Sequence, residues 1–154
     1  MRLLKLFALL ATLTIAATAA AHADPGRNLE AILRPAAAGP ESGFGLVEFR
    51  QPKDENVIVH LDVWVRDLLP NHTYTIQRAV DTAVDDDCTG TNWTMPTLGS
   101  VTTDESGTGR AALVRPLPAV LLGADLDIHF RVIDPAADDA VVLQSACYQF
   151  TVSQ

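Results

Sequence analysis

Residues 56–66 constrain the fold more than any other stretch of this chain, because their side chains alternate strictly along the sequence. One set is entirely aliphatic and the other is mostly polar or aromatic: Val57, Val59, Leu61, Val63 and Val65 against Ile58, His60, Asp62, Trp64 and Arg66. Successive side chains of a strand point to opposite faces, whereas a helix would distribute the valines around its axis. The stretch therefore predicts a β-strand with one buried face.

Shorter stretches repeat this alternation, with turn residues between them. The further predicted strands cover residues 45–50, 74–80, 98–102, 110–114, 126–133 and 141–152. Residues 28–34 are compatible with a short strand or with one helical turn, and residues 81–96 with a long loop. About seven short strands, and no long helix after residue 23, predict an all-β fold, namely an antiparallel immunoglobulin-like β-sandwich.

The segment from Leu68 to Tyr74 contains a corner motif. It reads Leu-Leu-Pro-Asn-His-Thr-Tyr and has the spacing Leu-x-Pro-x-x-x-Tyr. This resembles the corner that precedes a strand in fibronectin-like and other immunoglobulin-like domains. The resemblance implies that the Tyr74 hydroxyl bonds back to the chain. More broadly, the chain resembles small secreted bacterial immunoglobulin-like β-sandwich domains, a likeness that implies no catalytic residue.

The first 23 residues have the three parts of a secretory signal peptide. Arg2 and Lys5 supply the positive start, an apolar run rich in Leu and Ala follows, and Ala21-His22-Ala23 supplies small residues for cleavage. We therefore expect residues 1–23 to be a signal peptide, 24–42 a lead-in segment and 43–154 the β-sandwich. The expected location is secreted or periplasmic.

The net charge and the hydropathy of the chain restrict the kinds of partner that we expect it to bind. The chain carries 11 Lys+Arg and 19 Asp+Glu, a formal net charge of −8, and an acidic surface repels phosphate backbones. No apolar run after the signal peptide is long enough to span a bilayer. Nucleic acid and a membrane span are thus not expected, and the partner is expected to be a protein or a small polar ligand.

Cys88 and Cys147 are the only two cysteines. In an oxidising compartment two such cysteines are expected to form a disulfide, and no Cys-x-x-Cys redox motif is present. The bridge is predicted to be structural, and to tie the long loop 81–96 to the last strand.

Two predicted strands carry polar side chains on the face opposite the core. These residues are His60, Asp62, Trp64 and Arg66 on one strand, and Asp127, His129 and Arg131 on the other. If the strands are neighbours, they form one interaction patch with Trp64 as its anchor. The alternative, which we favour, is cross-strand ion pairing on a solvated face. Trp93, in the long loop, is either a further interaction residue or a lid over one end of the domain.

Recognisable catalytic motifs are missing. The sequence contains no Gly-x-Ser-x-Gly, no phosphate-binding glycine loop and no His-Glu-x-x-His, so no catalytic residue, metal ligand or cofactor is assigned. Asp85–Asp87 form an acidic run without regular ligand spacing, for which we expect no tight calcium site. The predicted function is a non-enzymatic binding protein. The alternative is a small secreted enzyme or metal-dependent protein that uses His60, His129 and nearby Asp residues.

Overall fold

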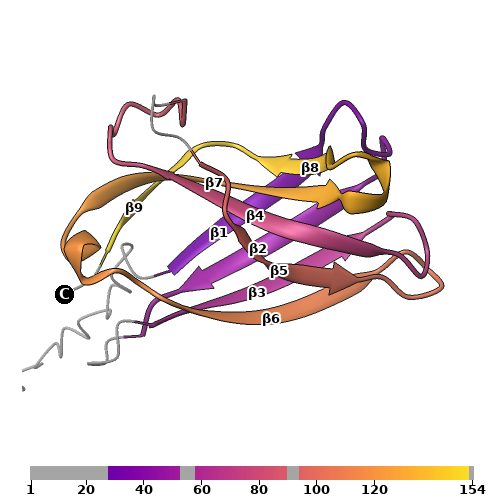
Figure 1. Cartoon of the computed structure of the whole chain (residues 1–154), viewed down its shortest axis with the longest axis horizontal. Helices are drawn as coiled ribbons and strands as arrows, with labels where there is room; N and C mark the ends of the chain where they lie inside the picture. The colour runs from indigo at the N-terminus through magenta and orange to yellow at the C-terminus, as the bar shows by residue number, and fades with distance from the viewer. Residues whose placement is uncertain (1–27, 53–57, 90–93, 153–154) are drawn as a thin grey trace, which may run out of the picture.

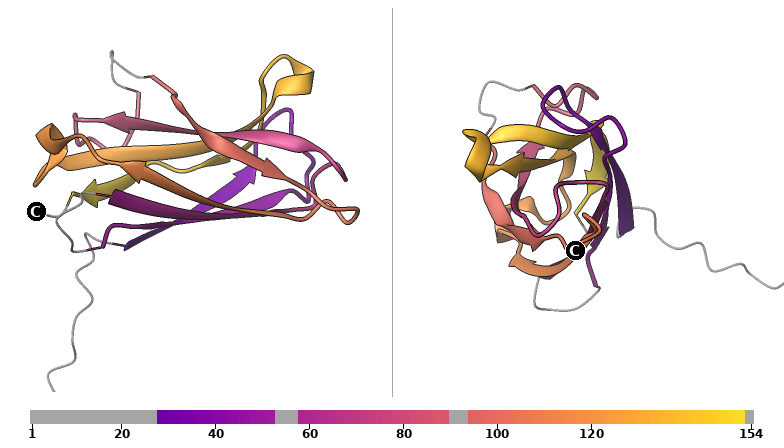
Figure 2. Two further views of the ribbon diagram at one scale, coloured as in Figure 1. Left: turned by 60° about the horizontal axis from the view of Figure 1, so that its bottom comes forward. Right: turned by 90° about the vertical axis from the view of Figure 1, so that its right-hand side faces the viewer.

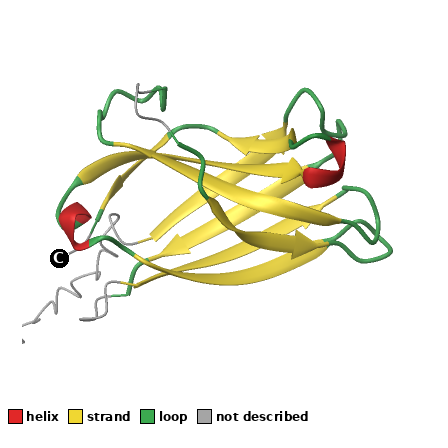
Figure 3. Ribbon diagram, viewed as in Figure 1, coloured by secondary structure: helices red, strands yellow, loops and turns green. Residues whose placement is uncertain are grey.

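The computed structural model describes residues 28–52, 58–89 and 94–152. Within these ranges the chain forms nine strands and two short 3-10 helices (Figures 1 and 3). The strands are β1 (Asn28–Pro35), β2 (Phe44–Arg50), β3 (Ile58–Arg66), β4 (Thr73–Asp81), β5 (Thr97–Thr102), β6 (Gly109–Pro116), β7 (Asp125–Asp134), β8 (Ala140–Ser145) and β9 (Tyr148–Thr151). The helices are η1 (Ala119–Leu121) and η2 (Pro135–Ala137). The predicted all-β class is confirmed.

All nine strands belong to one antiparallel sheet. Its order is β5-β4-β7-β8-β1-β2-β3-β6, and β9 pairs with β7. The two strands at the ends of this order, β5 and β6, follow each other in the chain, and an isolated bridge between Thr103 and Gly109 joins them at their common turn. The sheet is therefore nearly closed and barrel-like, as the end-on view in Figure 2 shows.

The inward-facing side chains fill the interior of this curved sheet. The predicted alternation of β3 is confirmed, because Val59, Leu61, Val63 and Val65 are all buried. Phe49 lies among the core aromatics, with its ring centroid 4.6 Å from that of Phe150 in an edge-to-face contact and 6.4 Å from that of Phe130. Such aromatic pairs add roughly 0.5–1.5 kcal/mol to the effect of burial alone.

The fold differs from the predicted sandwich of about seven strands in two places. The segment expected to lead into the domain contributes β1, which lies between β8 and β2 in the sheet. Residues 141–152, expected to form one strand, form most of β8 and all of β9. These two changes account for nine strands instead of seven, and the strands join edge to edge in one sheet.

A change of register separates β8 from β9. Arg131 of β7 lies opposite Gln144, whereas Ile128 lies opposite Tyr148. Three residues along β7 thus correspond to four along the C-terminal segment, so the extra residue forms a bulge before β9. A bulge bends a strand, and β9 accordingly remains paired with β7 while the β1–β8 pairing ends at Leu33 and Ser145.

The corner before β4 is held by the bond that the resemblance implied. The Leu69 backbone N–H donates to the Tyr74 hydroxyl at 3.0 Å, and the Thr103 hydroxyl donates to the Leu69 carbonyl at 2.6 Å. The neighbouring turn requires a glycine, since Gly107 has φ +76° and a Cβ there would lie 2.2 Å from the Leu68 carbonyl oxygen. The motif therefore stabilises this end of the barrel.

Some predictions fall on residues that the structure leaves undescribed. The signal peptide, residues 1–23, and Trp93 lie outside the described ranges. Within residues 28–52, 58–89 and 94–152, no helix has the length and apolar character needed to cross a membrane.

Candidate functional site

The outward face of β1, β2, β3 and β6 carries side chains in rows that the strand register defines. In the first row Phe44 lies opposite Arg66. The Arg66 guanidinium carbon is 5.2 Å from the Phe44 ring centroid, and that of Arg34 on β1 is 5.4 Å from the same centroid. Phe44 is thus in contact with two cations, each an attractive contact with the π-system of the ring.

The second row is mainly apolar. Leu46 pairs with Ile32 on one side and with Trp64 on the other, and Trp64 pairs with Arg110 of β6. The Trp64 and Phe44 rings meet edge to face, with centroids 5.8 Å apart. Trp64 is half-buried, so part of its indole ring remains accessible on this face.

The third row is acidic. Glu48 lies opposite both Glu30 and Asp62, which places like charges side by side across three strands. Arg50 forms an ion pair with Asp62 and offsets part of this repulsion. Because both partners are exposed, this ion pair contributes at most about 1 kcal/mol to stability. The acidic row therefore remains available for other contacts.

A groove lies between the apolar row and the acidic row. Its volume is about 480 Å³, and its lining includes Leu46, Glu48, Asp62, Trp64, Arg110 and Ala112. We call it the Trp64 groove. It presents an indole ring, a guanidinium and two carboxylates over an apolar floor, in a volume that is typical of small-molecule sites. These groups suit a ligand that has both polar groups and an apolar surface.

The predicted residues of β3 lie on or beside this groove. Asp62 and Trp64 line it, and Arg66 stacks on Phe44 at its end. His60 is exposed and lies between Arg50 and Val114 on the neighbouring strands.

The predicted residues of β7 lie elsewhere. Three strands, β8, β1 and β2, separate β7 from β3 in the sheet. The joint patch of the two strands therefore does not form. Alternation fixes which face of its own strand a side chain occupies, but not which strands are neighbours.

Asp127 is completely buried, contrary to the expectation of an exposed face. The loop 82–89 lies over it, and the Asp127 Oδ2 atom accepts hydrogen bonds from the backbone N–H groups of Asp85 (2.9 Å) and Asp86 (2.8 Å). The other oxygen, Oδ1, is buried without a hydrogen-bond partner. The carboxylate thus fastens the loop to the sheet rather than facing solvent.

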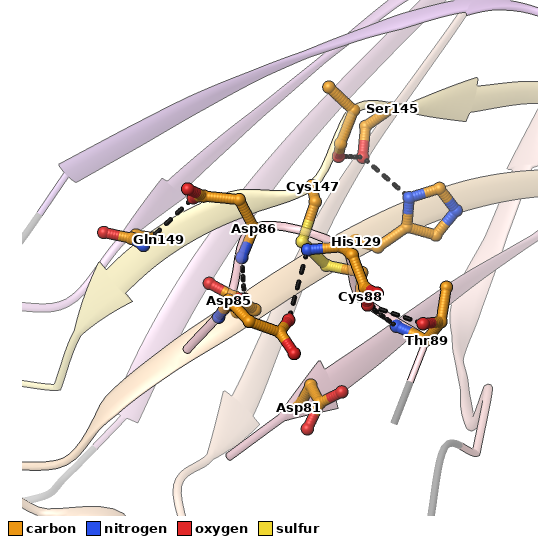
Figure 4. Close-up of a disulfide and its surroundings, with 12 residues drawn as sticks. Asp81, Asp85, Asp86, Cys88, Thr89, His129, Ser145, Cys147 and Gln149 are labelled. Atoms are coloured by element: carbon orange, nitrogen blue, oxygen red, sulfur yellow. Dashed lines mark hydrogen bonds between the residues drawn. A yellow bond between two sulfur atoms is a disulfide. The ribbon is translucent and has the colours of Figure 1, made fainter. Parts of the chain in front are cut away.

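The predicted disulfide lies beside this loop and is confirmed. Cys88 and Cys147 are bonded, with Cα atoms 5.6 Å apart, and Cys147 lies in the bulge before β9 (Figure 4). Next to it is His129, whose Nδ1 atom is 3.5 Å from the Ser145 hydroxyl oxygen. Burial lowers the pKa of His129 and favours the neutral imidazole. Arg131 donates through Nε to the Gln77 side chain at 2.8 Å.

The geometry does not bring the histidines together into a metal or catalytic centre. His60 and His129 lie on strands that are not neighbours. In the described part of the chain, no group of three or more His, Cys, Asp and Glu side chains is placed to hold a metal ion.

Sequence reasoning missed several residues of the groove region: Arg34, Phe44, Leu46 and Arg110. The alternation of residues 44–50 carries a usable signal, because it places Phe44 and Leu46 on the same face as Glu48 and Arg50. Arg34 and Arg110 have no such signal, since their place depends on which strands pair.

Comparison with known proteins adds no family to this description. The sequence matches no model of a known protein family and no curated protein.

Proposed function

We propose that this protein is an exported, non-enzymatic binding domain whose Trp64 groove holds a small polar ligand or a segment of a partner protein. The observation that carries the proposal is the groove itself, where the cross-strand pair of Trp64 and Arg110 lies next to the cross-strand pair of Glu48 and Asp62.

The placement of these residues supports binding. Tryptophan and arginine are the residue types that contribute most often to binding energy at protein interfaces. Here they project from the paired strands β3 and β6, whose hydrogen bonds fix the backbone before any ligand arrives. A fixed site loses less conformational entropy on binding than a loop does.

Export is supported by two features. The first 23 residues have the composition of a signal peptide, and the Cys88–Cys147 disulfide is of a kind that persists in oxidising compartments. We therefore place the protein in the periplasm or outside the cell. Among the described residues, no arrangement favours the alternative in which His60 and His129 act together in catalysis or metal binding.

Capture of partners tests the proposal for a protein ligand. The purified protein and its Trp64→Ala variant are each cross-linked to the extracellular or periplasmic fraction of the producing cells, and the captured proteins are compared by mass spectrometry. Val120→Ala is the matched control, because Val120 is 85% exposed and lies on η1, away from the groove. We expect a partner that Trp64→Ala loses and Val120→Ala retains.

Tryptophan fluorescence tests whether the Trp64 groove binds a small ligand. The chain has two tryptophans, so the Trp93→Phe variant leaves Trp64 as the sole indole fluorophore. Low-molecular-weight fractions of the same compartment should change the Trp64 emission, and Arg110→Ala should weaken that change. If Trp64→Ala retains every captured partner and no fraction alters Trp64 emission, the proposal is wrong.

A further inference from the structure

The outward face of β1, β2 and β3 carries a charge pattern that is its own complement. These strands lie side by side (Figure 1), and each contributes one residue to each of three rows. We call the row of Phe44, Arg34 and Arg66 the cationic row. The acidic row lies four residues away along each strand, or about 13 Å, with the apolar row between them. From the cationic to the acidic row the strands read Arg34, Ile32 and Glu30 on β1, Phe44, Leu46 and Glu48 on β2, and Arg66, Trp64 and Asp62 on β3.

Neither charged row is fully neutralised within the described part of the chain. Glu48 lies between Glu30 and Asp62, and of these three only Asp62 has an ion-pair partner among the described residues, namely Arg50. Arg34 likewise takes part in no ion pair there. Like charges at neighbouring positions of a sheet are destabilising. Both rows therefore gain stability from opposite charges that approach from outside the chain.

The apolar row between them is left partly in solvent. Ile32 is 38% exposed, and Leu46 and Trp64 are only half-buried. Both Leu46 and Trp64 line the open Trp64 groove, so they are accessible to another molecule. Covering such apolar surface is a main source of affinity between protein chains.

We propose that this face binds the same face of a second copy of this chain and forms a symmetric dimer. A two-fold axis that lies between the two copies, parallel to their apolar rows, places each cationic row on the acidic row of the other copy. Arg34 then faces Glu30 of the second copy, and Arg66 faces Asp62 of the second copy. The two apolar rows pack against each other along the axis.

The presence of both signs on one face favours a second copy over a partner of a single sign. A uniformly basic segment would match Glu30 and Glu48 but would meet like charge at Arg34 and Arg66. A second copy presents opposite charge to both rows at once. Arg110 lies on β6, the last strand of the sheet order, and stays in solvent at the edge of the face. This inference rests on the proposed function, because it names the partner that the Trp64 groove holds.

Sedimentation velocity of the purified protein over a range of concentrations tests the inference. We expect a monomer–dimer equilibrium, and we expect Trp64→Ala to raise its dissociation constant by roughly tenfold or more, because the indole lies beside the axis in both copies. A natural protein that stays monomeric up to about 1 mM overturns the inference. The proposed function would then still be decided by the captured partners and by the Trp64 emission.

Charge reversal tests the arrangement of the two copies. Arg34→Glu puts a glutamate against Glu30 of the second copy, and Glu30→Arg puts an arginine against Arg34 of the second copy. Both positions are exposed, and each variant alone should dimerise more weakly by roughly tenfold or more. In an equimolar mixture the two variants again bring opposite charges together, so we expect a mixed dimer with an affinity close to that of the natural protein.

Native mass spectrometry distinguishes the mixed dimer from the two homodimers. Glu105→Arg is the matched control, because it reverses the same charge on the exposed turn between β5 and β6, away from this face. It should dimerise as the natural protein does. Equal weakening by Glu105→Arg and Glu30→Arg, or a mixture that is no more dimeric than its components, contradicts the proposed dimer.

Discussion

The outward faces of β3 and β7 look alike in sequence and differ completely in the structure. Each alternates apolar residues with Asp, His and Arg. On β3 these side chains face solvent and border the Trp64 groove. On β7 Asp127 is fully buried beneath the loop 82–89, and His129 is partly buried beside the disulfide.

The difference arises from the path of the chain after β4, the strand that pairs with β7. The segment that follows β4 is long enough to fold back over β7, where a carboxylate and a covalent bond hold it. No described segment covers β3 in that way, and its face retains an open groove. A polar face in an alternating pattern therefore indicates the side of the sheet, but not whether another part of the chain covers it.

The largest expected effect is on stability, and it comes from the disulfide that fastens the loop over the β7 face. Cys88 and Cys147 are 59 positions apart, and closing a loop of that length stabilises a domain by about 3–4 kcal/mol. Cys88→Ser or reduction should lower the melting temperature by on the order of 10 °C. Calorimetry with and without reductant measures this. An unchanged melting temperature on reduction, with loss of the bridge verified by mass spectrometry, would show that the covered face does not depend on it.

Removing one carboxylate from each face should give the next largest difference, measured as the loss in the free energy of unfolding. Asp127→Ala leaves the Asp85 and Asp86 N–H groups without their acceptor, which should lower the free energy of unfolding by about 2 kcal/mol. Asp62→Ala breaks one exposed ion pair and should cost at most about 1 kcal/mol. Denaturant unfolding of both variants is the measurement. Equal losses would mean that Asp127 does not fasten the loop.

Trp64→Ala should have a smaller effect on stability than on binding. It removes the edge contact with Phe44, an aromatic pair worth roughly 0.5–1.5 kcal/mol. We therefore expect a folded protein, only slightly less stable, that has lost its ligand. A loss of stability as large as that of Cys88→Ser would indicate that Trp64 is a core residue and not part of an open site.

His129, beside the disulfide on the covered face, should make stability depend on pH. Burial lowers the pKa of His129, so the unfolded chain takes up a proton first as the pH falls below about 6.5. The free energy of unfolding then decreases until the folded protein also takes up that proton. His129→Gln should reduce this slope. Urea unfolding of the natural protein and of the variant across this pH range checks this, and an unchanged slope in His129→Gln would contradict the assignment.

Local patterns predicted much of the fold. The alternating stretches correspond to β2 through β7, and the spacing Leu-x-Pro-x-x-x-Tyr indicated the bond to the Tyr74 hydroxyl. The disulfide followed from two cysteines and an expected export. Each of these features depends on residues close in sequence or on simple chemistry.

The remaining features depend on long-range placement, which local patterns do not encode. The bulge before β9 shifts the register by one residue, and an alternating pattern gives no sign of it. Arg34 and Arg110 reach the face of Phe44 and Trp64 only because β1 and β6 pair with β2 and β3. The burial of Asp127 depends on the path of a loop that begins after a different strand.

Chemical labelling of His60 and His129 tests most directly the claim that one face is open and the other is covered by a disulfide-fastened loop. Diethyl pyrocarbonate modifies accessible neutral imidazoles, and mass spectrometry reports the rate at each histidine. We predict fast modification of His60 and slow modification of His129, with reduction of Cys88–Cys147 accelerating only His129. Equal rates in the oxidised protein, or no response of His129 to reduction, would contradict it.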